Sequence, residues 1–259
     1  FKKIISTKKY PLTRLQTPES SEMAKVLENS FRAMNISFID EWSRFAEKSG
    51  VNLFEVVDAI RMRPTHKNLM YPGIGVGGYC LPKDPLIASW SSENFFNLEG
   101  GLKNTVNAVN INDNMPRNCF LFVENILKKL RFSKKNIALL GVSYSPDIGD
   151  TRNSPVSNFY ENIKKISKKV GCFDPYLNFW DEKKIKIHQN IDIIFKNNDY
   201  EILIFTTAHK HFVDNDRFYK LLRNSKSDPI IIDAVGLIDP SKLPSRYQIN
   251  KNFFSLGVG

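Results

Sequence analysis

The two halves of this 259-residue sequence differ in the spacing of their apolar residues. Up to about residue 131 these residues recur every three or four positions, which is the period of an amphipathic helix. After residue 134, short apolar runs typical of buried strands alternate with helical patterns, as in a parallel sheet. The predicted strands are 136–140, 170–173, 202–205 and 230–232, and the predicted helices among them are 155–167 and 212–222. The sequence therefore predicts an all-helical domain followed by a Rossmann-like, parallel-sheet α/β domain.

The helical half begins with a long amphipathic pattern at residues 20–49. Ser20 or Ser21 can cap its start, and Gly50 suits the left-handed position after its end. Shorter helices are predicted at 53–60, after an Asn52 cap, and at 85–93, and a long connecting helix is predicted at 101–131, which Pro116 would kink or split.

Changes in composition divide the chain into three parts. Residues 1–17 are basic and interrupted by proline, and no Gly-x-Gly-x-x-Gly turn of a dinucleotide-binding domain precedes residue 73. We expect residues 1–17 to be a linker from an N-terminal domain outside this chain. Residues 18–131 would then form the helical domain with its connecting helix, and residues 134–259 the α/β domain.

Charge and cysteine content exclude several classes of protein. There are 37 Lys and Arg against 27 Asp and Glu, but no nucleic-acid motif accompanies the net charge of +10, so a lysine-rich solvated surface explains it most simply. A positive field would still favour a diphosphate-bearing ligand. No apolar run approaches the roughly 18 residues of a membrane span. Three widely spaced cysteines indicate a reducing compartment, so we expect a cytoplasmic protein that binds neither nucleic acid nor membranes.

Residues 72–85 form a glycine-rich segment that contains a single cysteine. They read Pro-Gly-Ile-Gly-Val-Gly-Gly-Tyr-Cys-Leu-Pro-Lys-Asp-Pro, so Cys80 follows four glycines and Asp84 lies four residues further on. Glycine permits positive φ and a close approach of the backbone to a ligand, and a cysteine presented in this way is a candidate nucleophile. The alternative is a flexible loop that ends in a buried cysteine, packed as a small apolar residue.

Lys25 and Asn29 form a second candidate pair. They lie four residues apart on the predicted helix 20–49, so they share one face of it. A lysine charge and an amide donor together can stabilise an oxyanion; the alternative is an ordinary pair on a solvated face.

We expect Cys119 and Cys172 to be structural residues, and the four histidines form no metal-ligand set, so no metal site is predicted.

Three ordered motifs resemble the nucleotide-sugar 6-dehydrogenases, the family of the UDP-glucose and UDP-N-acetylmannosamine dehydrogenases. The first is a helix with Lys-x-x-x-Asn, here Lys25 and Asn29, and the second is the Gly-x-Gly-x-Gly-Gly-x-Cys-x-x-x-Asp loop. The third comprises residues 138–144, read as Ala-Leu-Leu-Gly-Val-Ser-Tyr, followed by Asp147, Asp150, Thr151, Arg152, Ser154 and Pro155. The resemblance extends from about residue 15 to residue 239.

The resemblance implies a four-electron oxidation of a sugar C6 hydroxyl in two NAD-dependent steps. Cys80 would capture the intermediate aldehyde as a thiohemiacetal, which is oxidised to a thioester and hydrolysed to the uronic acid. Lys25 and Asn29 would stabilise developing negative charge, and Asp84 would assist water or proton transfer. NAD would be bound mainly by the N-terminal domain outside this chain. Lys83 would raise the positive potential near the thiol and the cofactor, unless it only faces solvent.

The resemblance also implies a nucleotide-sugar site at Gly77, Gly78 and Tyr144. Tyr144 would stack on the base, and Arg152 would reach a phosphate and line the cofactor site. The alternatives are a core tyrosine and a surface salt bridge.

Two departures from the family pattern remove cations. Family members commonly carry Lys at the position of Ser145, and an arginine shortly after the late Asp, where this chain has Asp233-Ala234-Val235-Gly236. Their loss would weaken diphosphate binding or change its geometry. The alternative function is therefore a non-catalytic remnant that binds a nucleotide sugar or only dimerises.

The helix at 20–49 also predicts an assembly. We expect that its apolar residues cannot all lie on a single narrow stripe: Met23, Phe31, Met34, Phe38, Trp42 and Phe45. Burial against a second copy about a twofold axis would hide the excess, and the resemblance likewise implies a homodimer through the helical domain. Contact with the absent N-terminal domain is the competing explanation.

Overall fold

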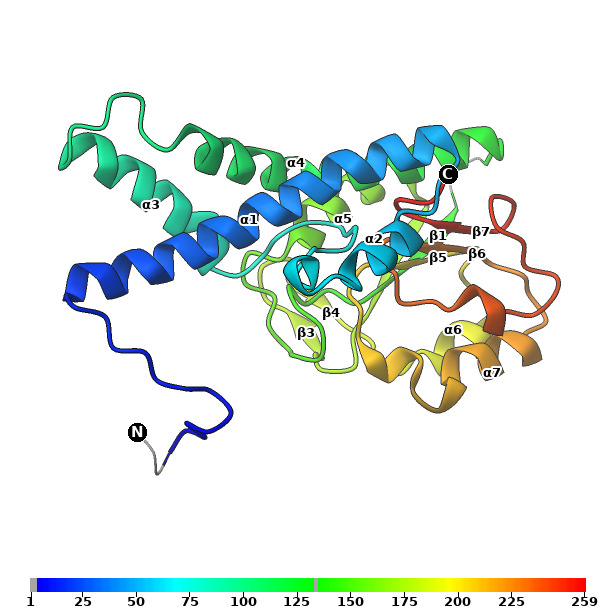
Figure 1. Ribbon diagram of the computed structural model, residues 1–259. Coiled ribbons are helices and arrows are strands. Elements are labelled where there is room, and N and C mark those ends of the chain that lie inside the picture. The colour runs from blue at the N-terminus through cyan, green and yellow to red at the C-terminus, as the bar shows by residue number, and fades with distance from the viewer. Residues whose placement is uncertain (1–3, 133–134) are drawn as a thin grey trace.

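The computed structural model describes residues 4–132 and 135–259. The start of the expected linker (residues 1–3) and the expected boundary at 133–134 lie outside this range. Helices come first: α1 (Pro18–Ser49), α2 (Leu53–Arg61), α3 (Cys80–Asn94) and α4 (Lys103–Lys129). They are followed by β1 (Asn136–Leu140), α5 (Pro155–Ile166), β2 (Lys169–Phe173), β3 (Phe179–Trp180), β4 (Ile185–Lys186), α6 (Asp192–Asn197), β5 (Ile202–Phe205), α7 (Arg217–Asn224), β6 (Ile230–Asp233) and β7 (Phe253–Ser255). Figure 1 shows this helical layer beside the α/β domain, which confirms the predicted fold class.

The start of α1 and the course of α4 past Pro116 differ from the prediction. Thr17, and not Ser20 or Ser21, caps α1: its side chain accepts a hydrogen bond from the Ser20 N–H at 3.2 Å. Gly50 closes α1 with φ 75°, as expected. Pro116 does not split α4, which is one helix from Lys103 to Lys129.

The buried face of α1 is small and polar, whereas its outer face is apolar. The buried residues are Asn29, Ser30, Ala33, Ser37, Ile39, Asp40, Ser43 and Ala46. The exposed apolar residues are Met23, Leu27, Phe31, Met34, Phe38, Trp42 and Phe45, with exposed fractions between 38% and 71%. At about 100° per residue, these seven side chains fall within one arc of about 100°. The expectation that they exceed a single stripe was wrong, and the stripe is nevertheless uncovered.

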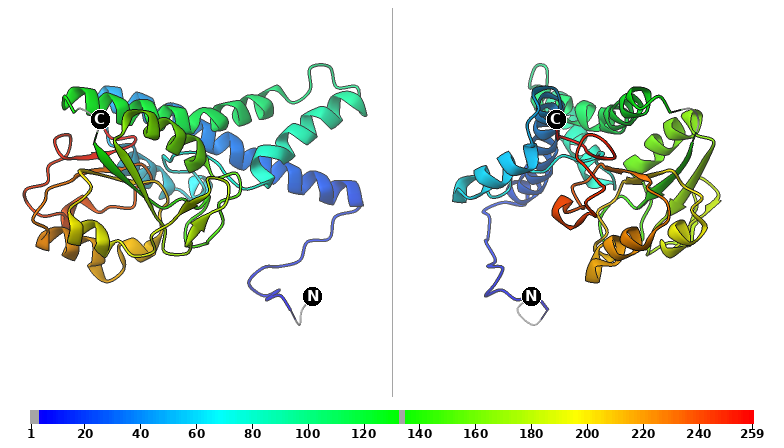
Figure 2. Two further views of the ribbon diagram at one scale, coloured as in Figure 1. Left: turned by 180° about the vertical axis from the view of Figure 1, so that it is seen from behind. Right: turned by 90° about the vertical axis from the view of Figure 1, so that its right-hand side faces the viewer.

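The main sheet has the strand order β2-β1-β5-β6-β7, with every neighbouring pair parallel. Helices α4 and α5 cover one face, and α6 and α7 cover the other (Figures 1 and 2). Strands buried on both faces read as continuous apolar runs, which is why β5 and β6 were predictable. β7 and the β3–β4 hairpin were not predicted, because two or three residues carry no recognisable period.

Helix α7 begins later than the predicted residue 212. Two short 3₁₀ turns precede it, at Lys210–Phe212 and Asp214–Asp216, and Asn215 and Asp216 adopt left-handed φ values of 52° and 57°. This backbone interrupts the helix, although the apolar spacing continues through it.

The last described residues tie the two domains together. The Gly257 N–H donates to Glu47 Oε1 at 2.9 Å, and the Leu53 N–H donates to the Gly257 carbonyl at 3.0 Å. Asn52 also forms an antiparallel bridge with Val258. The end of α1 and the start of α2 are therefore fixed against the edge of the sheet. Among the described helices, none has the length and apolar character needed to cross a bilayer.

Candidate functional site

The glycine-rich loop that precedes α3 lies against the segment that connects β1 to α5. A Cβ atom on Gly77 would lie 2.5 Å from Tyr144 Cβ and 2.8 Å from the Asn153 carbonyl oxygen. Gly78 has φ 77°, and its N–H donates to the Arg152 carbonyl at 3.3 Å. Because these glycines have no side chain, the backbone of the loop packs directly against the α/β domain.

Cys80 is the first residue of α3 and is exposed, whereas the other two thiols are buried. Burial raises the pKa of the Cys119 thiol, and it raises the pKa of Cys172 to about 12. Neither buried thiol therefore forms a thiolate near neutral pH, and both sit in the core as predicted. Helix α3 starts five residues before the predicted 85–93 segment, and this places the cysteine at a helix N-terminus.

A chain of polar side chains joins α1 to the first turns of α3. Lys25 Nζ donates to Asn29 Oδ1 at 3.3 Å, and Asn29 Nδ2 donates to Asp84 Oδ2 at 2.7 Å. Asp84 Oδ1 also pairs with Lys83 Nζ at 3.2 Å. Asn29 is only 2% exposed, so it is not part of an ordinary solvated face.

Lys25 sits at the exposed end of this chain. A hydrogen bond to Glu28, at 2.8 Å, is the main cause that raises the pKa of Lys25. The charges of Cys80 and Asp84 act in the same direction to a smaller extent. The structure thus brings Lys25, Asn29 and Asp84 together through direct contacts, and Cys80 begins the helix that carries Asp84.

Arg152 and Tyr144 lie on the β1–α5 segment that contacts the glycine loop. The Asp150 carboxylate binds Arg152 through Nη2 at 2.6 Å and Nε at 3.0 Å, and raises the pKa of the guanidinium. Arg152 is exposed and forms the surface salt bridge that the sequence left open, while Tyr144 is half-buried against Gly78.

Tyr79 lies beside the candidate site, and the sequence analysis did not single it out. Its ring is 53% exposed, it immediately precedes Cys80, and the Arg152 guanidinium carbon lies 5.5 Å from the ring centre. The available signal was its place in the motif, directly before the cysteine.

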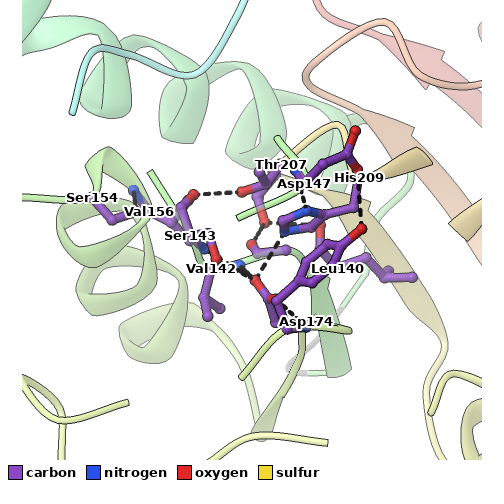
Figure 3. Close-up of polar contacts among 12 residues, drawn as sticks. Leu140, Val142, Ser143, Asp147, Ser154, Val156, Asp174, Thr207 and His209 are labelled. Carbon is purple, nitrogen blue, oxygen red and sulfur yellow. Dashed lines mark hydrogen bonds and ion pairs between the residues drawn. The ribbon is translucent and has the colours of Figure 1, made fainter. Parts of the chain in front are cut away.

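A dense polar cluster holds the carboxyl ends of β1, β2 and β5 (Figure 3). Asp174 Oδ2 accepts hydrogen bonds from the Val142 N–H at 2.9 Å and from the Ser143 N–H at 3.1 Å. His209 Nε2 lies 3.0 Å from the same oxygen, and His209 Nδ1 accepts from the Asp147 N–H at 2.9 Å. Because Nδ1 accepts from that N–H, Nε2 is the ring nitrogen that donates to Asp174.

The carboxylate of this cluster is ionised. Burial is the largest influence and would raise the pKa of Asp174, but the hydrogen bonds from His209, Val142 and Tyr176 together outweigh it and lower the pKa. A buried anion that accepts this many donors is fully satisfied.

The α/β domain does not fit a dinucleotide in the usual place. In Rossmann sheets the pyrophosphate binds at the first strand-to-helix turn, through free backbone N–H groups. Here the N–H groups of Val142 and Ser143 are taken by Asp174, a negative side chain. These two N–H groups are therefore not free to bind a pyrophosphate.

A pocket of about 350 Å³ opens between α2 and the carboxyl ends of β6 and β7. Phe54 and Tyr71 stack in its wall with ring centres 5.9 Å apart, and Asp58 and Asp233 supply carboxylates. Its described lining contains neither lysine nor arginine. Phe54 contacts Gly236 so closely that a side chain there would collide with the ring.

Comparisons with known proteins agree with this architecture. Residues 19–113 match the central domain, and residues 138–240 the UDP binding domain, of the UDP-glucose/GDP-mannose dehydrogenase family. The chain is 34% identical over 217 residues to a UDP-N-acetyl-D-mannosamine dehydrogenase of Pyrococcus horikoshii. The aligned region covers 80% of this chain and 50% of that protein. An enzyme of the same description from Campylobacter jejuni is 36% identical over 200 residues, or 75% of this chain and 46% of that protein.

Solved structures give the same result. The structure of UDP-D-ManNAc dehydrogenase from P. horikoshii has a TM-score of 0.74 at 29% identity, covering 92% of this chain and 52% of that one. An NDP-N-acetyl-D-galactosaminuronic acid dehydrogenase from Methanosarcina mazei also has a TM-score of 0.74, at 25% identity, with 92% and 51% covered. The chain spans about half the length of these relatives. It belongs to the UDP-glucose/GDP-mannose dehydrogenase family, a family of nucleotide-sugar dehydrogenases.

Proposed function

We propose that this chain is the catalytic and substrate-binding part of a UDP-sugar 6-dehydrogenase that oxidises the sugar C6 hydroxyl to a carboxylate. One observation carries the proposal. The exposed thiol Cys80 begins α3, and the next turn of that helix places Asp84 2.7 Å from the buried amide of Asn29, which in turn contacts Lys25.

The side chains of this set suit the chemistry of a bound aldehyde. Cys80 Sγ would form a bond to the aldehyde carbon, and the carbonyl oxygen would take the negative charge. The Lys25 ammonium and the Asn29 amide would stabilise that oxygen. At the thioester stage, Asp84 would accept a proton from water as the Cys80 thiolate leaves.

NAD would accept both hydrides, and it would be held mainly by an N-terminal domain. Residues 1–17 would be the linker to that domain, residues 18–131 the helical domain and residues 134–259 the α/β domain. Lys83 and Arg152 are the proposed contacts of this chain with the cofactor side of the site. Both are exposed on the face that carries Cys80 and Tyr79, where a negatively charged cofactor would be attracted.

The proposed substrate is a nucleotide sugar placed beside Gly77, Gly78 and Tyr144, as in the UDP-sugar enzymes to which the chain is similar. Support comes from the position of Tyr144, whose ring contacts Gly78, two residues before the thiol. A reducing, cytoplasmic setting accords with three free thiols.

The proposed assembly is a homodimer through α1. Its seven-residue apolar stripe is uncovered in the single chain, although its opposite face is already used against α3 and α4. A twofold axis would bring two identical stripes together and remove both from water.

One observation favours a different function, a remnant that binds a nucleotide sugar or only dimerises. The pocket at Gly236 is lined by Asp58 and Asp233 without a compensating cation among its described residues, and Ser145 replaces a lysine. The Asp58 carboxylate in the pocket wall, with no cation beside it in the described lining, would repel a diphosphate.

A turnover assay separates the two functions. The chain, supplied with the dinucleotide-binding domain of a UDP-sugar dehydrogenase, would be given NAD and a panel of UDP-sugars. We expect two NADH per sugar and a uronic acid product, and neither from a Cys80→Ser control. Binding of UDP-sugar by calorimetry without turnover for any sugar would instead identify the remnant.

A further inference from the structure

The buried pair His209 and Asp174 has no part in the proposed chemistry. Both side chains are 0% exposed, and they come from segments 35 residues apart, at the carboxyl ends of β5 and β2. Burying polar groups of this kind is costly unless each finds a partner. Here every ring nitrogen and carboxylate oxygen has one, so the pair is a built feature of the fold.

The partners of the pair lie on the segment that follows β1. Asp174 holds its beginning through the N–H groups of Val142 and Ser143 and through Ser143 Oγ at 2.9 Å. His209 holds its middle through the Asp147 N–H at 2.9 Å. Figure 3 shows His209 and Asp174 next to each other, with Val142 and Ser143 beside Asp174 and Asp147 beside His209.

The same segment holds the catalytic loop at its far end. The Gly78 N–H donates to the Arg152 carbonyl at 3.3 Å, and Asn153 Nδ2 donates to the Gly78 carbonyl at 3.2 Å. The Tyr144 N–H, near the start of the segment, donates to the Asp150 carbonyl at 2.8 Å, which closes the segment on itself. Gly78 lies two residues before Cys80.

We propose that His209 and Asp174 are positioning residues, which fix the segment 142–154 and through it the backbone at Gly78 that sets the placement of Cys80. The proposal rests on the proposed function, because only a reactive thiol needs such placement. Neither residue would touch substrate. The path consists of hydrogen bonds to backbone groups of a segment with little regular structure, which would otherwise sample many conformations.

The test compares two substitutions of His209 in the full chain. His209→Gln retains one donor and one acceptor on an amide, so it can replace both imidazole contacts, whereas His209→Leu removes them. The readouts are amide hydrogen exchange of residues 142–154 and 72–80, and the rate at which iodoacetamide alkylates Cys80. With Leu we expect exchange in both segments to rise by about tenfold, as for loss of a buried hydrogen-bond partner. The alkylation rate should change by about threefold or more, and Gln should restore both readouts.

Tyr247→Phe is the matched control. Its hydroxyl makes a buried hydrogen bond to the Pro229 carbonyl at 3.0 Å, next to the amino end of β6 and away from the cluster. This variant should lower the stability of the protein without changing amide exchange in residues 142–154 or 72–80. The proposal is overturned if Tyr247→Phe changes the alkylation rate of Cys80 as much as His209→Leu does. It is also overturned if His209→Leu speeds exchange in residues 142–154 but leaves exchange at Gly78 and alkylation of Cys80 unchanged.

Asn153→Asp provides a second test should His209→Leu fail to fold. Asn153 is exposed, with φ 51°, a conformation that Asp tolerates. The change replaces the donor to the Gly78 carbonyl with a carboxylate oxygen, which cannot donate and repels that carbonyl. Amide exchange should rise in residues 72–80 and stay unchanged in residues 142–147. Unchanged exchange at Gly78 would refute the proposed connection from residues 142–154 to the loop before Cys80. None of these readouts involves turnover, so their failure differs from failure of the dehydrogenase assay.

Discussion

Asn29 and Asp84 are 55 residues apart in the sequence, and a 2.7 Å hydrogen bond joins Asn29 Nδ2 to Asp84 Oδ2. The bond connects the buried face of α1 to the second turn of α3. It therefore fixes the start of α3, and with it Cys80, relative to the Lys25–Asn29 pair.

Removing the amide from this contact should destabilise the protein. In Asn29→Ala we expect a loss of about 1–3 kcal/mol in the free energy of unfolding, because the mostly buried Asp84 loses its donor. A double-mutant cycle with Asp84→Ala, measured by urea unfolding, should give a coupling of about 1 kcal/mol. Lys25→Ala is the control: its side chain is 65% exposed, so the change should be about 0.5 kcal/mol or less. Zero coupling would contradict the contact.

Cys80 should be the one thiol that reacts readily in the native protein. Iodoacetamide should label Cys80 about a hundredfold faster than Cys119 or Cys172, because burial raises the pKa of both core thiols. Mass spectrometry of tryptic peptides would measure this. Cys80→Ser should end uronate release, whereas Cys119→Ser and Cys172→Ser should lower only stability. Full uronate production by Cys80→Ser would remove the nucleophile assignment.

Two glycines of the same loop should tolerate alanine very differently. At Gly77 a methyl group would meet Tyr144 Cβ at 2.5 Å and the Asn153 carbonyl at 2.8 Å, so the loop must move away from the α/β domain. We expect Gly77→Ala to cost about 1–3 kcal/mol by analogy with overpacked cores and to alter Cys80 alkylation. Gly73 has open space around it and should tolerate alanine. Equal effects of the two substitutions on thermal unfolding would contradict this packing.

The stability of the protein should fall in acid partly through Asp174. Its folded pKa is lowered, so its contribution is present above the ordinary value near pH 4 and is lost as the pH falls through the folded pKa. Asp174→Asn should therefore flatten the loss of stability between about pH 4 and pH 2.

The contribution of Asp233 to stability should change with pH in the opposite direction. Burial raises its pKa, so its contribution is present below about pH 4 and is lost as the pH rises through the folded pKa. Asp233→Asn should remove that decline. Urea midpoints measured in both variants from about pH 2 to about pH 7 test the two signs, because the Asp174 effect lies below the ordinary pKa and the Asp233 effect above it. An identical change of slope in the two variants would contradict them.

The apolar stripe of α1 should control assembly. Phe38→Asp, at a position 49% exposed in the single chain, should convert a dimer to a monomer at micromolar concentration in sedimentation. Phe96→Asp is the matched control, because Phe96 is 77% exposed but lies outside the stripe. A monomer for the unmodified protein, or loss of the dimer in both variants, would rule out this interface.

Local chemistry made much of the fold predictable from the sequence. β5 and β6 are continuous apolar runs, and strands buried on both faces need no alternation. Asn52 and Gly50 act within one helical turn, so their capping roles follow from neighbouring residues alone. The shared face of Lys25 and Asn29 likewise follows from the pitch of a helix.

Only the tertiary structure decided how these local features meet. Helical periodicity cannot say which face of α1 is covered, and packing against α3 and α4 buried its polar face and left its aromatic face bare. The glycines could have faced a ligand, but domain contact placed Gly77 against Tyr144. His209 and Asp174 become partners only because parallel strands end at the same edge of the sheet. Such contacts depend on segments far apart in the chain, whose relative positions are set by burial of the whole core.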